Sequence, residues 1–105
     1  MKACLSRCYP FRVRSTDTRE AFDRHSTGYD QRFSQQPIGA AVRREVWSLA
    51  DRAFANAARL IDLGCGTGED AIHFAEQGMH VTAVDSSTGM LKQLRAKLRK
   101  LQLGL

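Results

Sequence analysis

The segment LIDLGCGTGED, residues 60–70, decides the fold of this chain. Residues 60–63 predict a short buried strand, and the three glycines after it predict a tight turn. A helix follows at about residues 69–77, with Gly78 as its C-terminal cap. The segment HVTAVD, residues 80–85, predicts a second strand, and residues 86–103 predict a helix with Ser86 or Ser87 as N-cap. Strand, helix, strand and helix in this order predict an α/β fold with parallel strands.

The residues before this unit predict two further regions, divided at about residues 17 and 56. Residues 18–56 are expected to be helical, with Gly28 separating two short pieces and an amphipathic helix at about residues 38–55 after Pro37. The first sixteen residues hold one Lys, three Arg and no acid. They lack both the amphipathic stripe of a transit peptide and the apolar centre of a secretory signal. Residues 1–17 are therefore expected to form a flexible basic tail.

Composition excludes several classes of protein. At 105 residues the chain has room for one small domain, and no apolar run is long enough to cross a bilayer. The net charge of +5 comes from residues 1–60, which carry eleven Lys and Arg against six acids. This scattered excess lies away from the glycine turn, so a nucleic-acid partner is not expected. Three cysteines without paired spacing predict neither a disulfide framework nor a metal site, and favour a reducing, cytoplasmic setting.

The glycine turn is the candidate ligand site, because ligands bind at the carboxyl ends of strands in open α/β sheets. A dinucleotide fingerprint would need a third glycine where Glu69 stands, and the Lys of a Walker phosphate loop is missing. Glu69 and Asp70 in the first turn of the helix would repel a diphosphate. Asp85 ends the second strand, where a carboxylate can accept hydrogen bonds from both hydroxyls of a ribose. A nucleoside without phosphates, such as S-adenosylmethionine, fits these features.

Three segments carry a family resemblance. Residues 62–68, DLGCGTG, resemble motif I of the class I S-adenosylmethionine-dependent methyltransferases, D-x-G-x-G-x-G. Residues 84–91, VDSSTGML, resemble the second motif of that family, and residues 22–33, FDRHSTGYDQRF, are similar to a segment of its small-molecule branch. The resemblance covers about residues 20–103 and implies a Rossmann-like methyltransferase fold. Of this fold, residues 57–105 would supply the first βαβα portion, preceded by N-terminal helices.

The resemblance also implies the roles of individual residues. The turn glycines would let the backbone approach the cofactor, and the acid before them would support the turn and face the methionine end. The acid of the second strand would hold the ribose, and the residues after it would flank the adenine. An N-terminal tyrosine would help to close the methionine end, while the cysteine of the turn fills space. The cofactor-binding residues implied are Asp62, Gly64, Cys65, Gly66, Gly68, Asp85, Ser86, Met90 and Tyr29.

The expected function is methyl transfer to a small-molecule acceptor in a complete protein of which this chain is the N-terminal part. No catalytic residue is predicted, and the chain alone is expected to be inactive. Without further strands, much of the apolar stripe of the last helix, formed by Leu91, Leu94, Leu98 and Leu101, is expected to lack a partner and to favour self-association. Two alternatives stay open. One is a non-catalytic remnant that binds a partner through its sheet edge, and the other is a nicotinamide-binding half-domain, against which Glu69 argues.

Overall fold

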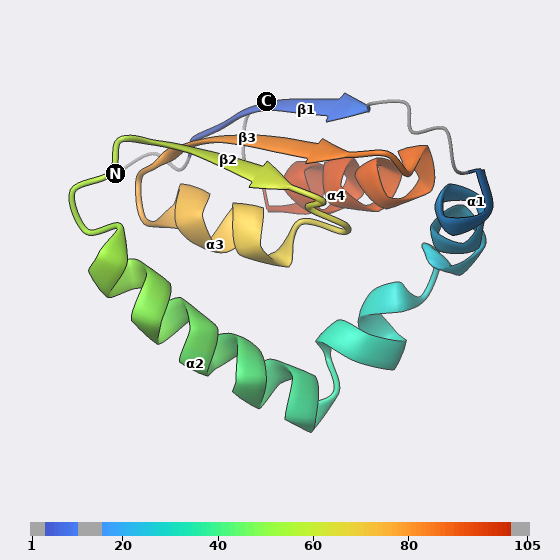
Figure 1. Ribbon diagram of the computed structural model, residues 1–105, viewed down its shortest axis with the longest axis horizontal. Coiled ribbons are helices and arrows are strands. Elements are labelled where there is room, and N and C mark those ends of the chain that lie inside the picture. Colours follow the sequence, from blue (N-terminus) through green and yellow to red (C-terminus); the bar gives the residue numbers. More distant parts are fainter. Residues whose placement is uncertain (1–3, 11–15, 102–105) are drawn as a thin grey trace.

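A computed structural model describes residues 4–10 and 16–101. Its centre is a parallel sheet with strand order β1-β3-β2 (Figure 1). The strands are β1 (Cys4–Pro10), β2 (Arg59–Leu63) and β3 (His80–Asp85). Leu60 pairs with Val81, and Asp62 pairs with Ala83. The predicted parallel pairing of the two strands around the glycine turn is confirmed.

The helices lie close to their predicted bounds. They are α1 (Thr16–His25), the π-helical turn η1 (Asp30–Ser34), α2 (Pro37–Ala53), α3 (Glu69–Glu76) and α4 (Thr88–Lys100). Gly28, with φ 76°, separates α1 from η1 as predicted, and Gly78, with φ 91°, follows α3. Ser87 is the N-cap of α4, because its side chain accepts a hydrogen bond of 3.1 Å from the Met90 N–H.

The prediction of a flexible tail over residues 1–17 is wrong for β1. This strand pairs in parallel with β3, with Leu5 opposite Val81 and Cys8 opposite Ala83. A strand at the edge of a sheet leaves a row of backbone N–H and C=O groups unpaired, and a neighbouring segment in extended conformation can satisfy them. The basic side chains of this segment did not predict a strand, because pairing between backbones does not depend on charged side chains.

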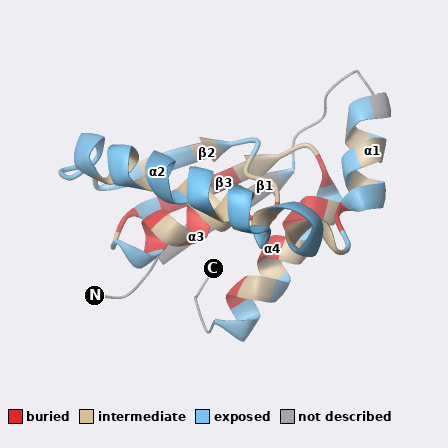
Figure 2. Ribbon diagram, turned by 90° about the horizontal axis from the view of Figure 1, so that it is seen from below, coloured by how far each residue is buried: buried red, intermediate tan, exposed pale blue. Residues whose placement is uncertain are grey.

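The core lies between one face of the sheet and two helices, α3 and α4, as the buried residues in Figure 2 show. The predicted exposure of the leucine stripe is wrong for Leu91, Leu94 and Leu98, which are at most 1% exposed, whereas Leu101, just after α4, is 48% exposed. Helix α4 contacts both β1 and β3, so the unexpected third strand widens the surface on which it packs. The other core residues come from β3, α3 and the loop between them: Val81, Ala83, Ala71, Ile72, Phe74, Ala75 and Met79.

The exposed apolar surface lies elsewhere. The predicted stripe of α2 faces solvent, with Ile38 81% and Leu49 62% exposed, and only Trp47 and Ala50 of this helix pack against the core. On the sheet face away from the helices, Leu63 of β2 is 75% exposed. Helices α2, α3 and α4 lie on one side of the sheet, and α1 lies beyond the ends of the strands (Figure 1). Within residues 4–10 and 16–101, none of these helices has the length and apolar character needed to span a bilayer.

Candidate cofactor-binding site

The glycine turn leaves the end of β2 and is fixed to β3 by its backbone. The N–H groups of Gly64 and Cys65 donate to the Val84 carbonyl, at 2.7 and 3.0 Å. Gly64 and Gly66 have φ values of 73° and 58°, a left-handed conformation that strains any residue with a side chain. A Cβ atom built at either position would meet no atom within 4 Å. The backbone of the turn therefore borders open space, into which a ligand can come close.

Gly68 has a different role. It also has a positive φ, 87°, but a Cβ atom there would overlap the side chain of Leu94. Gly68 thus permits close packing of the start of α3 on α4. Contact between Gly68 and the cofactor stays a prediction.

Asp85 braces the turn from the end of β3. One carboxylate oxygen accepts a hydrogen bond of 2.8 Å from the Gly66 N–H, and the other accepts one of 2.8 Å from the Ser87 N–H. These bonds hold the turn and the start of α4 in register. A carboxylate has about four lone-pair sites, so each oxygen can still accept a bond from a ligand hydroxyl.

A cavity of about 300 Å³ opens above the turn. It brings together six of the nine predicted cofactor residues: Tyr29, Gly64, Gly66, Asp85, Ser86 and Met90. Asp62, Cys65 and Gly68 are not among its lining residues. Two residues of α1, Thr18 and Phe22, complete the wall and were not predicted as site residues. Phe22 begins the segment that carried the family resemblance, so that segment held a signal for it.

Asp62 lies on β2, two residues before Gly64, and has an unusual carboxyl group. Within the described part of the chain, its Oδ2 atom is buried and has no hydrogen-bond partner. The pKa of Asp62 is raised to about 6, first by burial and then by the negative charges of Asp70 and Asp85, while Arg43 opposes them. A buried acceptor without a donor is costly, so this oxygen is well suited to a ligand that brings a donor or a positive charge.

Cys65 belongs to the turn and does not line the cavity. It is half-buried and packs against the core, and its Sγ lies 3.6 Å from the Gly66 carbonyl oxygen. This position agrees with the space-filling role expected for it.

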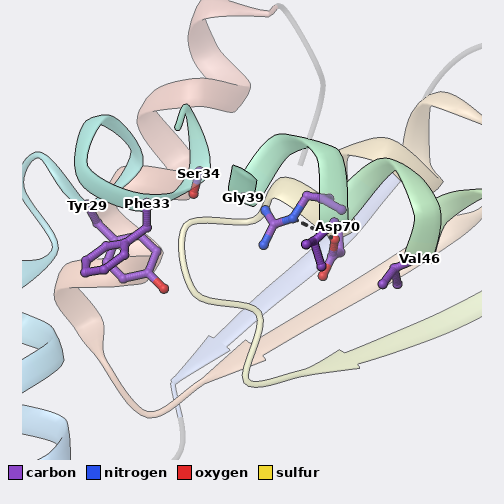
Figure 3. A pocket seen from close by; sticks show the side chains of 8 residues that line it. Tyr29, Phe33, Ser34, Gly39, Val46 and Asp70 are labelled. Carbon is purple, nitrogen blue, oxygen red and sulfur yellow. Dashed lines mark ion pairs between the residues drawn. The ribbon is translucent and has the colours of Figure 1, made fainter. Parts of the chain in front are cut away.

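A second cavity of about 370 Å³ shares Tyr29 with the first (Figure 3). Tyr29 and Phe33 form one side, with ring centroids 4.9 Å apart. Apolar residues of α2 form the other side, together with an ion pair of 3.6 Å between Arg43 and Asp70. A small molecule with an apolar body could occupy this space beside a ligand on the glycine turn.

Helix α2 is attached to α3 by polar and aromatic contacts. The Trp47 Nε1–H donates to Asp70 at 2.8 Å, and the Trp47 ring stacks on His73 at 4.0 Å. His73 Nε2 lies 2.8 Å from a carboxylate oxygen of Asp51. In residues 4–10 and 16–101, no group of three His, Cys, Asp or Glu residues is placed to hold a metal ion.

Asp23 on α1 was also missed by sequence analysis. Its carboxylate accepts hydrogen bonds from the Ser87 hydroxyl and, at 3.0 Å, from the Gly89 N–H. These bonds, that of Ser87 first, hold the pKa of Asp23 below its usual value. Asp23 thus attaches α1 to the start of α4, next to the residues that line the cavity.

Comparison with known proteins points to one family. Residues 60–105 match the family model of a methyltransferase domain. The chain is 38% identical to a demethylmenaquinone methyltransferase of Clavibacter sepedonicus over 73% of its own length and 31% of that protein. It is 36% identical to the human glycine N-methyltransferase over 67% of its length and 25% of that protein. The chain thus spans about a quarter to a third of the length of these relatives.

A solved structure agrees with the sequence matches. The structure reported as "Conversion of a Disulfide Bond into a Thioacetal Group during Echinomycin Biosynthesis" superposes on this chain with a TM-score of 0.51 at 36% identity. The match covers 56% of this chain and 24% of that one. Together with the three motifs and the parallel sheet, these matches place the chain, over part of its length, in the class I S-adenosylmethionine-dependent methyltransferase family.

Proposed function

We propose that this chain supplies the S-adenosylmethionine-binding part of a methyltransferase that acts on a small-molecule acceptor. The observation that carries the proposal is the open cavity above Gly64 and Gly66, with the Asp85 carboxylate at its side. The absent Cβ atoms leave room for a ligand against the backbone. The acid at the strand end provides acceptors for a ribose diol.

The residues of the cavity fit the parts of S-adenosylmethionine. Asp85 would accept hydrogen bonds from the ribose, and Ser86 and Met90 would border the adenine. Asp62, which does not line the cavity, would interact with the methionine end directly or through water, and a donor brought to its buried Oδ2 would relieve the cost of an unpaired acceptor. Tyr29 would cover that end from the N-terminal side.

When bound, the cofactor supplies a methyl group on a positively charged sulfur, which is already an activated leaving group. The remaining task of the protein is to align the acceptor with the methyl carbon and to exclude water. Orientation of this kind can contribute about 7–11 kcal/mol to a reaction. We assign the aligning role to the walls of the two cavities that meet at Tyr29, and we assign no catalytic base.

Two observations support a small-molecule acceptor. The second cavity, at about 370 Å³, has the volume of a small ligand and adjoins the cofactor cavity. The relatives named above carry glycine and demethylmenaquinone in their names, and both are small molecules. A cytoplasmic setting stays a prediction from the spacing of the cysteines.

The alternatives are less well supported. A nicotinamide cofactor would place a pyrophosphate at the start of α3, where Glu69 and Asp70 stand in the first turn. A pure interaction module is favoured only by the exposed apolar stripe of α2 and by Leu63 on β2. Neither alternative accounts for the open space at Gly64 and Gly66 together with Asp85.

Calorimetric titration of residues 1–105 distinguishes these functions. We expect S-adenosylhomocysteine to bind weakly and measurably, and NAD to give no binding heat. Tighter binding of NAD than of S-adenosylhomocysteine would favour the nicotinamide reading. Absence of binding by both ligands would favour the interaction module.

A further inference from the structure

A polar cluster lies where the glycine turn, η1 and α4 meet. Its members are Lys97, Asp30, Glu69 and Thr67, called here the Lys97 cluster. The ammonium nitrogen of Lys97 lies 2.6 Å from Asp30 Oδ2 and 2.7 Å from Glu69 Oε1. It also donates to the Thr67 hydroxyl at 3.1 Å, and that hydroxyl donates to Asp30 Oδ1 at 2.6 Å. One cation thus serves two carboxylates and one hydroxyl.

The Lys97 cluster is shielded from solvent, which strengthens its interactions. Thr67 is buried, and the side chains of Lys97 and Asp30 are only 23% and 17% exposed. Burial alone would raise the pKa of Asp30, but hydrogen bonds from Lys97, Thr67 and Ser34 outweigh it and hold that pKa below its usual value. Loss of the ammonium would leave two shielded carboxylates close together without a counter-charge, which is strongly unfavourable.

The Lys97 cluster joins three separate parts of the chain. Asp30 is the first residue of η1, Thr67 and Glu69 flank Gly68 at the start of α3, and Lys97 lies on α4. The turn η1 contains no buried residue, so apolar packing contributes little to its position. Charged hydrogen bonds therefore provide the main attachment of η1 to the glycine turn and α4.

This attachment bears directly on the cofactor cavity. Tyr29 precedes Asp30 in the chain, and its ring lines the cavity together with Gly64 and Gly66. A shift of η1 away from α4 would carry Tyr29 with it and open one wall. A wall that is already in place costs no ordering energy when the ligand binds.

We infer that Lys97 is a positioning residue. Through Asp30 it holds η1, and with it Tyr29, against the glycine turn, so that one wall of the cofactor cavity is formed before the ligand arrives. The effect on ligand affinity rests on the function proposed above, whereas the attachment of η1 does not.

Hydrogen exchange of the ligand-free chain tests the attachment. Lys97→Met keeps the length of the side chain and removes its charge, and Lys92→Met, on the exposed side of the same helix, is the matched control. In Lys97→Met, amide exchange in residues 26–36 should become about tenfold faster, with exchange in β3 unchanged. Lys92→Met should behave as the wild type. Equal acceleration throughout the chain, or no acceleration at all, would overturn the inference.

Ligand affinity tests the consequence. The dissociation constant of S-adenosylhomocysteine should rise about tenfold in Lys97→Met, equal to about 1.4 kcal/mol. Asp30→Asn should cause a similar rise, and the double variant should be no worse than the worse single variant, because both changes break one link. Additive losses would show that Lys97 does not act through Asp30, and would refute the positioning role.

Two further comparisons keep the outcomes separate. If Lys97→Met does not fold, Asp30→Asn serves for the exchange measurement, with the same expected pattern and the same contradicting ones. If the wild-type chain shows no affinity for S-adenosylhomocysteine, the proposed function fails, while the exchange of residues 26–36 still decides whether Lys97 holds η1.

Discussion

The variant Asp62→Asn is expected to stabilise the ligand-free chain and to weaken its binding of ligand. The wild-type carboxyl group has a buried Oδ2 without a donor, and its pKa is raised from 3.8 to about 6, first by burial and then by the charges of Asp70 and Asp85. The folded state therefore holds a proton on Asp62 that the unfolded state has released between about pH 4 and pH 6. Consequently, the free energy of unfolding decreases as pH rises from about 4 to about 6, because the folded state then has to release this proton from a buried carboxyl group.

The magnitude follows from the shift. About two pKa units correspond to about 3 kcal/mol, and partial contact with solvent reduces this to about 1–2 kcal/mol. Asp62→Asn removes the buried charge, so at pH 7.5 the free energy of unfolding of the ligand-free variant should exceed that of the wild type by this amount. At pH 4, where the wild-type carboxyl group is protonated in the folded state, the two proteins should differ little. Urea unfolding at both pH values measures the difference.

Ligand binding should respond in the opposite direction. An ammonium group favours the ionised carboxylate, so the affinity of the wild type for S-adenosylhomocysteine should rise by up to about tenfold from pH 5 to pH 7. Asp62→Asn should bind more weakly at pH 7 and show no such rise. Calorimetry at pH 5, 6 and 7 provides the comparison. A flat pH profile in the wild type, or wild-type affinity in Asp62→Asn, would refute a role for this carboxylate at the methionine end.

The remaining predictions address the strand end, the turn and the whole chain. Asp85→Ala should weaken S-adenosylhomocysteine binding by about 1.5–3 kcal/mol, with Asp85→Asn less affected because it keeps one acceptor oxygen; unchanged calorimetric affinity in Asp85→Ala would remove this residue from the site. Gly66→Val should abolish binding through strain and lost space, whereas Gly68→Ala should lower the free energy of unfolding by about 1–3 kcal/mol through its overlap with Leu94. Normal binding by Gly66→Val would show that the turn is only structural. Residues 1–105 alone should transfer no methyl group to candidate acceptors, because a ligand in the open cavity above the glycine turn stays in contact with water. Turnover in a radiolabel assay would contradict this.

The local features of the fold could be predicted from the sequence. The bounds of β3 and the cap at Ser87 follow from short patterns in which each residue acts on its near neighbours. The gathering of Gly64, Gly66 and Asp85 also follows, since parallel strands end at the same edge of a sheet. Such features need no knowledge of distant contacts.

The features that were missed depend on contacts between distant segments. The pairing of Cys4–Pro10 with β3 is a backbone interaction that its basic composition does not reveal. Helix α4 contacts this added strand, and Leu94 and Leu98 are buried although the sequence suggested that they would lack a partner. Likewise, the link from Lys97 to Asp30 spans more than sixty positions, and a basic residue near the end of a helix is already explained by the helix dipole.

The central claim is that S-adenosylmethionine binds on the glycine turn beside Asp85. The most direct measurement is a titration of the isotope-labelled chain with S-adenosylhomocysteine, followed by the amide resonances of each residue. We predict that the largest shifts occur at Gly64, Gly66, Asp85 and Ser86, with those of α2 little changed. Saturable shifts confined to α2 or to the exposed face of β2 would contradict the claim, as would a spectrum that does not change at all.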